Sequence, residues 1–199
     1  MRAFLLKEVE MKLRDLFKCN FINDGSRSLY ESILNPEVEK AMRKWEQQVP
    51  LEGVLIGGLA LAYYIKPRMT IDADFLFLSA AEIPSEVEGF KRTRPSAFMH
   101  KETHVEFEVL APEKINMPIE LAKKIIQTAK KQGNVYVASR EGLIASKLER
   151  FKFQDRADIN ALLQLGPVDL SNFPLDEVRK KNFQIALDTF EPLDEGIDE

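Results

Sequence analysis

Asp72 and Asp74 stand two residues apart in a segment whose side chains alternate between apolar and polar. Residues two apart on a strand point to the same face, with their Cα atoms roughly 6.5 to 7 Å apart. Two carboxylates placed in this way can converge on a pair of divalent cations, an arrangement suited to phosphoryl transfer. Taken alone, the pair fits the solvent face of an edge strand equally well.

Glu106 and Glu108 repeat this spacing in a second alternating segment, residues 104–110. A third carboxylate on a strand near the aspartates would hold a second ion or accept the proton of an attacking hydroxyl. Because both glutamates occupy one face of their segment, the spacing does not decide between them.

Gly57 and Gly58 follow the apolar run Val54–Ile56 and precede an apolar stretch of helical character. This order predicts a strand, a tight turn and a helix. Glycines at such a turn let a phosphate approach backbone N–H groups and the positive end of the helix dipole. Two adjacent glycines more often form an ordinary turn, so the motif gains weight only from the aspartates that follow it.

Lys147 falls within an apolar stripe formed by Ile144, Leu148 and Phe151 on a predicted helix. A lysine in a core-facing stripe is unusual without a partner or a ligand. Its ammonium group would either extend to solvent or point at an anion. A triphosphate site nearby favours the anion, whose charge a lysine would counter.

Asp155 and Asp158, three residues apart, share one face of the next predicted helix. Asp155 suits a helix cap as well as a functional role, and Asp158 is placed to orient Lys147 or Arg156. Arg68 and Thr70 extend the polar face of the aspartate segment toward the two glycines. We expect Arg68 to pair with phosphate or with an aspartate, and Thr70 to form a local hydrogen bond.

The remaining pattern predicts an α+β fold, in which a small mixed sheet is flanked by helices on both sides in sequence. Strands are expected at residues 54–56, 69–78, 97–101, 104–110 and 135–138, and helices at 5–19, 36–48, 59–65, 118–130, 140–153, 155–165 and 175–190. The chain is divided into a helical N-terminal extension, a core, a C-terminal helical part and an acidic tail, at residues 1–50, 51–138, 139–190 and 191–199.

The amino-acid composition argues against several classes of protein. With 28 basic and 32 acidic residues among 199, the net charge of −4 argues against nucleic-acid binding by bulk positive charge. A single cysteine fits a reducing, cytoplasmic location, and with two histidines, both expected at the surface, it makes a zinc site improbable. The apolar run 54–65 is shorter than the roughly 20 residues of a membrane span, so no membrane partner is predicted. Lys123, Lys124, Lys130 and Lys131 could steer an RNA or the triphosphate, but the favoured expectation is that they form one exposed face of an amphipathic helix.

These motifs together resemble a known superfamily. Gly57-Gly58, then thirteen residues, Asp72-Ala73-Asp74 and a later acidic residue resemble the signature of the DNA polymerase beta-type nucleotidyltransferases. More narrowly, residues 68–74, 143–148 and 155–159 resemble the nucleotidyltransferase toxins of abortive-infection type toxin–antitoxin systems. The resemblance spans residues 54–163.

The resemblance implies an Mg²⁺-dependent enzyme that moves a nucleoside monophosphate from a nucleoside triphosphate to a hydroxyl of an RNA or protein acceptor, with an antitoxin protein as a possible partner. It makes Asp72 and Asp74 metal ligands and Glu108 the third carboxylate, a role that Glu106 could also fill. The nucleotide-binding residues would be Gly57, Gly58, Arg68, Thr70, Lys147, Asp155 and Asp158. The alternatives are a non-catalytic nucleotide- or partner-binding protein of the same fold, and a metal-dependent phosphodiesterase.

Overall fold

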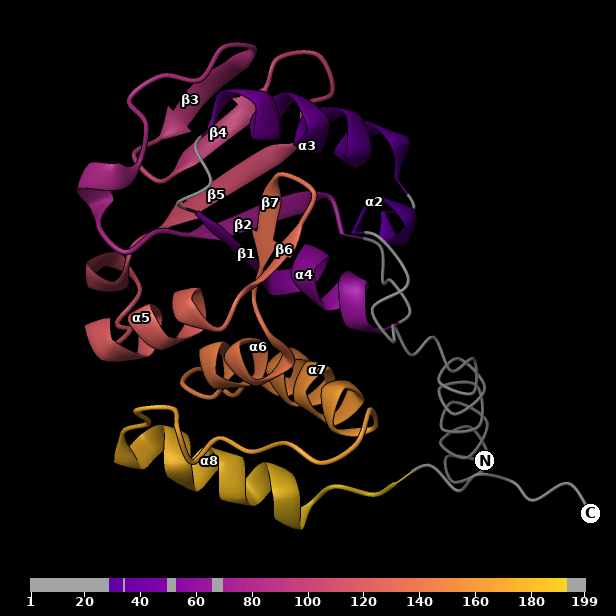
Figure 1. The fold of residues 1–199 in the computed structure, drawn as a ribbon, viewed down its shortest axis with the longest axis vertical. Coiled ribbons are helices and arrows are strands. Elements are labelled where there is room, and N and C mark those ends of the chain that lie inside the picture. The colour runs from indigo at the N-terminus through magenta and orange to yellow at the C-terminus, as the bar shows by residue number, and fades with distance from the viewer. Residues whose placement is uncertain (1–28, 34, 50–52, 66–69, 193–199) are drawn as a thin grey trace, which may run out of the picture.

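A mixed sheet forms the centre of the molecule, with the strand order β3-β4-β5-β2-β1-β7-β6 (Figure 1). The computed structural model describes residues 29–33, 35–49, 53–65 and 70–192. Two pairs of neighbours, β2 with β5 and β1 with β7, are parallel, and the other neighbours are antiparallel. The strands are β1 Val54–Ile56, β2 Asp72–Leu76, β3 Phe90–Arg94, β4 Ala97–His100, β5 Glu106–Leu110, β6 Lys130–Gln132 and β7 Val135–Val137.

Helices precede, interrupt and follow the strands, which confirms the predicted α+β class. Figure 1 shows α3 on one side of the sheet and α6, α7 and α8 in succession on the other. The helices are α2 Leu29–Ser32, α3 Pro36–Gln48, α4 Gly57–Tyr64, α5 Ile119–Gln127, α6 Arg140–Lys147, α7 Phe153–Leu163 and α8 Glu177–Asp188, with short 3₁₀ turns at Ala80–Glu82 and Pro112–Lys114. Among the described residues, no helix is both long and apolar enough to cross a membrane.

Trp45 on α3 is the centre of the aromatic packing on the buried face of the sheet. Its indole is 1% exposed and stacks on Phe107 with ring centroids 4.7 Å apart. Phe75, Phe90 and Phe98 surround it with centroids 5.2 to 5.6 Å away. These rings come from four different strands, so one side chain ties β2, β3, β4 and β5 to α3.

The strands that carry the carboxylates alternate as predicted. Since successive side chains point to opposite faces, burying one set under α3 sends the acidic set to the other face. The buried set is Ala73, Phe75, Phe107 and Val109, and the opposite set is Asp72, Asp74, Glu106 and Glu108. Ile71, expected on the buried side, precedes the strand and is 61% exposed.

The chain between residues 128 and 138 departs from prediction. The helix expected to reach Lys130 ends at Gln127, and Lys130–Gln132 forms β6. Gln132 pairs with Val135, so Gly133 and Asn134 make a two-residue hairpin turn, with Gly133 at φ +61°. Lys130 and Lys131 therefore lie on an edge strand and do not share a helix face with Lys123.

The loop expected between Pro84 and Gly89 is present. The edge strand Phe90–Arg94 that follows it was not foreseen, because only Phe90 in it is buried and no alternation appears. His100 was expected at the surface but is 5% exposed, with its ring 4.9 Å from that of Phe90 and its Nδ1 2.8 Å from the hydroxyl of Thr103. The predicted helix 5–19 lies outside the described residues.

Candidate active site

The four carboxylates form two pairs across the parallel strands β2 and β5. Asp72 lies opposite Glu106, and Asp74 lies opposite Glu108. Neighbouring strands are about 4.8 Å apart, and like charges directly opposite one another destabilise a sheet. The arrangement therefore needs positive charge close by.

Arg94 supplies positive charge to the outer pair. Its guanidinium forms an ion pair with Glu106 from the edge strand β3. Burial and the charge of Glu106 raise the pKa of Asp72, and Arg94 acts in the opposite direction. Of the two candidate third carboxylates, Glu106 is thus the one that already has a cationic partner.

The inner pair carries the most perturbed group of the site. Burial, followed by the negative charges of Glu108 and Asp72, raises the pKa of Asp74 to about 6. The positive charge of Lys147 and a hydrogen bond from the backbone amide of Gly58 act against this shift. No hydrogen bond from another described residue reaches Glu108, so its carboxylate can accept a proton or a cation.

Gly57 is required by the position of Asp74. Ile56 on β1 lies opposite Asp74, and the chain then turns into α4 through Gly57 at φ +70°. A Cβ at this position would lie 1.9 Å from Oδ2 of Asp74. Glycine is therefore required at position 57 for two reasons, the left-handed backbone and the close approach of the carboxylate.

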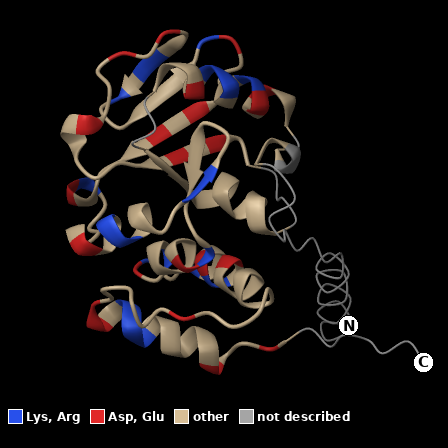
Figure 2. Cartoon of the chain, viewed as in Figure 1, with Lys and Arg blue, Asp and Glu red and all other residues tan. Residues whose placement is uncertain are grey.

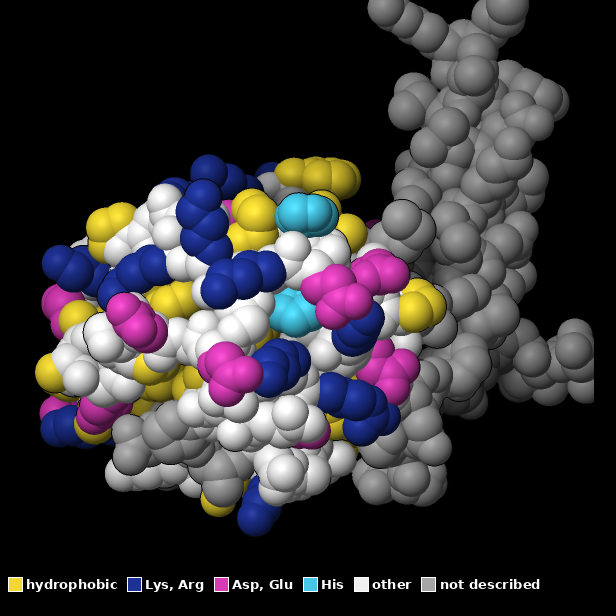
Figure 3. All heavy atoms as spheres, turned by 90° about the horizontal axis from the view of Figure 1, so that it is seen from above, with side chains coloured by type: hydrophobic (Ala, Val, Ile, Leu, Met, Phe, Trp, Pro, Cys, Tyr) yellow, Lys and Arg dark blue, Asp and Glu magenta, His cyan; other side chains and the backbone are white. Residues whose placement is uncertain are grey.

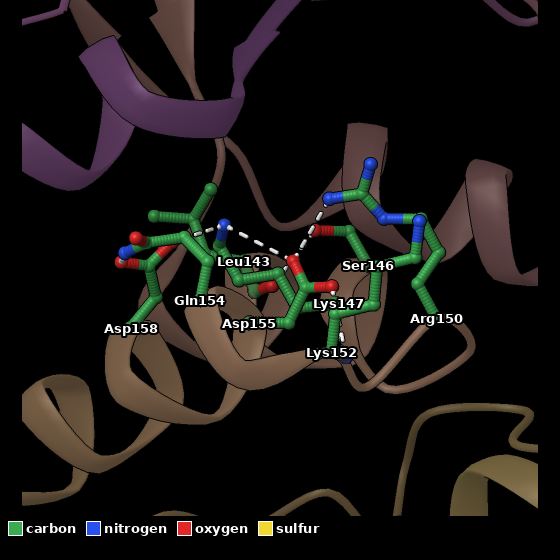
Figure 4. Close-up of polar contacts among 8 residues, drawn as sticks. All are labelled: Leu143, Ser146, Lys147, Arg150, Lys152, Gln154, Asp155 and Asp158. Carbon is green, nitrogen blue, oxygen red and sulfur yellow. Dashed lines mark hydrogen bonds and ion pairs between the residues drawn. The ribbon is translucent and has the colours of Figure 1, made fainter.

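Lys147 lies at the end of α6 and is 8% exposed (Figure 4). Its Nζ is 2.7 Å from Oδ2 of Asp158 and 4.0 Å from Oδ1 of Asp155. Gln154 donates a hydrogen bond of 2.9 Å to the other oxygen of Asp158. Buried aspartates on α7 therefore fix the lysine, as a buried charge requires, while its field still reaches Asp74.

Arg150 follows in the loop between α6 and α7 and was not foreseen as a site residue. It donates a 2.9 Å hydrogen bond to Asp155, its side chain is 69% exposed, and the charge of Asp74 contributes to raising its pKa. Asp155 also accepts a hydrogen bond of 3.3 Å from the backbone of Lys152, at the start of α7. The loop thus brings a solvent-accessible cation close to the carboxylates.

The structure gathers most, though not all, of the predicted residues. Thr70 donates a 3.2 Å hydrogen bond to the carbonyl of Asp72, and Arg68 lies outside the described residues. Phe151, predicted on the helical stripe of Lys147, lies beyond the end of α6 with φ +43°. Arg94 had no sequence signal, because the strand that carries it does not alternate.

The donor set fits a hard divalent cation, since it consists of carboxylate oxygens with uncompensated charge. Among the described residues, no three His, Cys, Asp or Glu side chains already converge as a finished metal cage. Mg²⁺ is usually bound by one or two carboxylates together with substrate phosphates and water, and does not require such a cage. Asp72 and Asp74, with Glu108 beside them, are the residues that would hold it.

Comparison with known families follows this geometry. Residues 34–180 match a family described as "Nucleotidyltransferase of unknown function" (DUF6036). The chain belongs to this family. No curated protein matches the chain.

The matched residues include the glycine turn, both carboxylate strands and the α6–α7 loop. The family description states nucleotidyl transfer and names no acceptor. The chain is therefore assigned to nucleotidyl transfer.

We predict that Gly57→Ala destabilises the protein more than Gly133→Ala does. Both glycines have a left-handed φ, but a Cβ at Gly133 meets nothing within 4 Å, whereas one at Gly57 meets Asp74. Gly133→Ala should lower the free energy of unfolding by about 1 kcal/mol, and Gly57→Ala by more than about 2 kcal/mol. Urea unfolding measures both, and equal losses would contradict the close approach.

The raised pKa of Asp74 predicts a pH dependence of stability in chelating buffer. The unfolded chain releases this proton near its ordinary pKa of 3.8, whereas the folded protein keeps it until about pH 6. Stability should therefore fall as pH rises from about 4 to 6, by up to about 3 kcal/mol. Asp74→Asn should remove most of this slope in urea unfolding measured across the range, and an unchanged slope would contradict the assignment.

Proposed function

We propose that the protein is an Mg²⁺-dependent enzyme that transfers a nucleoside monophosphate from a nucleoside triphosphate to an acceptor hydroxyl. The observation that carries the proposal is the in-register pair Asp74 and Glu108, set against the glycine turn of α4. The repulsion between these two carboxylates would be relieved by a divalent cation, which would also bind the phosphates of the nucleotide. Family membership supports the reaction class.

The reaction needs one bond made and one bond broken at phosphorus. The acceptor oxygen attacks the α-phosphorus, the bond to the β-phosphate oxygen breaks, and pyrophosphate leaves. Glu108 accepts the hydroxyl proton, because it lies beside Asp74 and has no hydrogen-bond donor among the described residues. Asp72 and Asp74 would hold the Mg²⁺, whose charge would neutralise that of the phosphates.

The triphosphate would lie between the start of α4 and the α6–α7 loop. Ile56, the N-cap of α4, provides no side-chain cap. The amide of Gly58 donates to Asp74, and the other amides in the first turn of α4 have no partner within the helix and would face the phosphates. Lys147 and Arg150 supply positive charge from the other side. Asp155 and Asp158 would position these two cations without touching the nucleotide themselves.

The proposal that this enzyme acts as a toxin is more specific, and it rests on the motif resemblance alone. Modification of an RNA or protein in the cytoplasm would account for toxicity, and an antitoxin protein would restrain it. We expect induced expression in a bacterial host to arrest growth and Asp74→Ala to abolish the arrest. Equal arrest by the variant would contradict a toxic activity at this site.

Nucleotide transfer itself is tested with labelled triphosphates, Mg²⁺, total RNA and total protein. We predict that Asp74→Ala and Glu108→Gln lower label incorporation at least about a hundred-fold, the usual scale for losing an acid–base group. Glu106→Gln is the matched control, since Glu106 lies opposite Asp72, two residues before Glu108 on β5, and forms an ion pair with Arg94. It should change transfer less than about ten-fold.

Two outcomes would contradict this account. If the Asp74→Ala variant transfers as much label as the wild type, the carboxylates take no part in the reaction. Release of nucleoside monophosphate with no labelled acceptor would identify a phosphodiesterase instead.

A further inference from the structure

The acidic face of the sheet continues beyond β5 to the edge strand β3. Residues directly opposite one another on neighbouring strands point to the same face, so the pairings trace rows across the sheet. One row runs Asp72, Glu106, Met99, Lys91, and the next runs Asp74, Glu108, Ala97, Arg94. The ion pair of Arg94 with Glu106 shows that the cations and the carboxylates share this face.

Each row changes from acidic to basic along its length. Lys91 is exposed and has no acidic partner among the described residues, and the Arg94 side chain is 55% exposed. Figure 2 shows the acidic residues on β2 and β5 as red bands and the basic residues on β3 in blue. Three strand spacings separate β3 from β2, or about 14 Å. Met99, half-buried, offers an apolar surface between the two ends.

Four other basic residues at this end of the molecule, Lys40, Arg43, Lys44 and Arg92, interact with other groups. Arg92 lies on the opposite face, where its guanidinium is 5.2 Å from the centre of the Phe98 ring and donates to the carbonyl of Pro95 at 2.6 Å. Figure 3 shows the basic and acidic side chains intermingled on the upper surface. On α3, Lys40, Arg43 and Lys44 form ion pairs with Glu102, Glu39 and Glu88 respectively.

We propose that Lys91 and Arg94 bind the backbone phosphates of a single-stranded nucleic-acid acceptor, whose terminal hydroxyl reaches the carboxylates. This inference rests on the proposed function and names the acceptor class for the same site. Arg94 exchanges Glu106 for a phosphate, and Met99 contacts the intervening nucleotide. A strand with a charge on every nucleotide places negative groups at this distance from its end whatever its sequence, whereas a protein acceptor would need an acidic residue at one fixed position.

The basic residues on the edge strand β3 explain how a protein of acidic total charge would bind RNA. A net charge of −4 gives no overall attraction for RNA. Two exposed cations at the outer end of the acidic face attract the acceptor backbone locally and direct its end inward.

Binding is tested with the full chain and a short fluorescein-labelled single-stranded RNA of mixed sequence, by anisotropy at several salt concentrations. Each phosphate contact to a single strand contributes about 0.7 to the slope of log K against log salt, so the double variant Lys91→Gln, Arg94→Gln should reduce the slope by about 1.4. Lys91→Gln alone should give about half of that reduction. The matched control is Lys131→Gln, an exposed lysine on β6, as many strands from β2 on the other side.

Transfer to the same RNA gives the second measurement. The double variant should raise KM for RNA and leave KM for the triphosphate unchanged. RNA affinity and KM equal to wild type would overturn the inference while the proposed function stands, and label on protein instead of RNA would overturn the acceptor class. RNA binding that depends on Lys91 and Arg94 without any transfer would support this surface and overturn the proposed function.

Discussion

Repulsion between Asp74 and Glu108 is the constraint around which the site is organised. Parallel pairing of β2 and β5 fixes the two carboxylates side by side, and neither can turn to the other face without exposing buried rings. The positive charge that acts on Asp74 comes from Lys147, which buried aspartates on α7 hold in place. A sheet built only for stability would not keep such a pair, and this supports the proposal that a cation completes the site.

The scaffold holds this unfavourable arrangement by strong packing on its other face. Trp45 contacts rings from four strands, and the glycine turn leaves room for the Asp74 carboxylate at the start of α4. The site is therefore assembled from a rigid sheet on one side and a helical pair, α6 and α7, on the other. This separation lets the carboxylates and the cations be positioned by different elements.

Local patterns predicted much of this arrangement. Alternation placed Asp72 and Asp74 on one face, and the order of apolar run, glycines and helix placed Gly57 beside them. The sequence did not show that β2 and β5 are neighbours in register, because strand pairing depends on contacts distant in sequence. That pairing separates Glu108 from Glu106. Arg94 and Arg150 were missed for a different reason, because β3 does not alternate and Arg150 lies in a loop.

The central claim is that these carboxylates form a cation site, and Mg²⁺-dependent stability tests it most directly. The thermal unfolding midpoint at pH 7 is measured against Mg²⁺ concentration for the wild type and for Asp74→Asn. The account predicts that Mg²⁺ stabilises the wild type by about 1.4 kcal/mol per tenfold increase above its Kd and leaves the variant unchanged. An equal rise in both proteins, or none in the wild type even with a nucleoside triphosphate present, would contradict it.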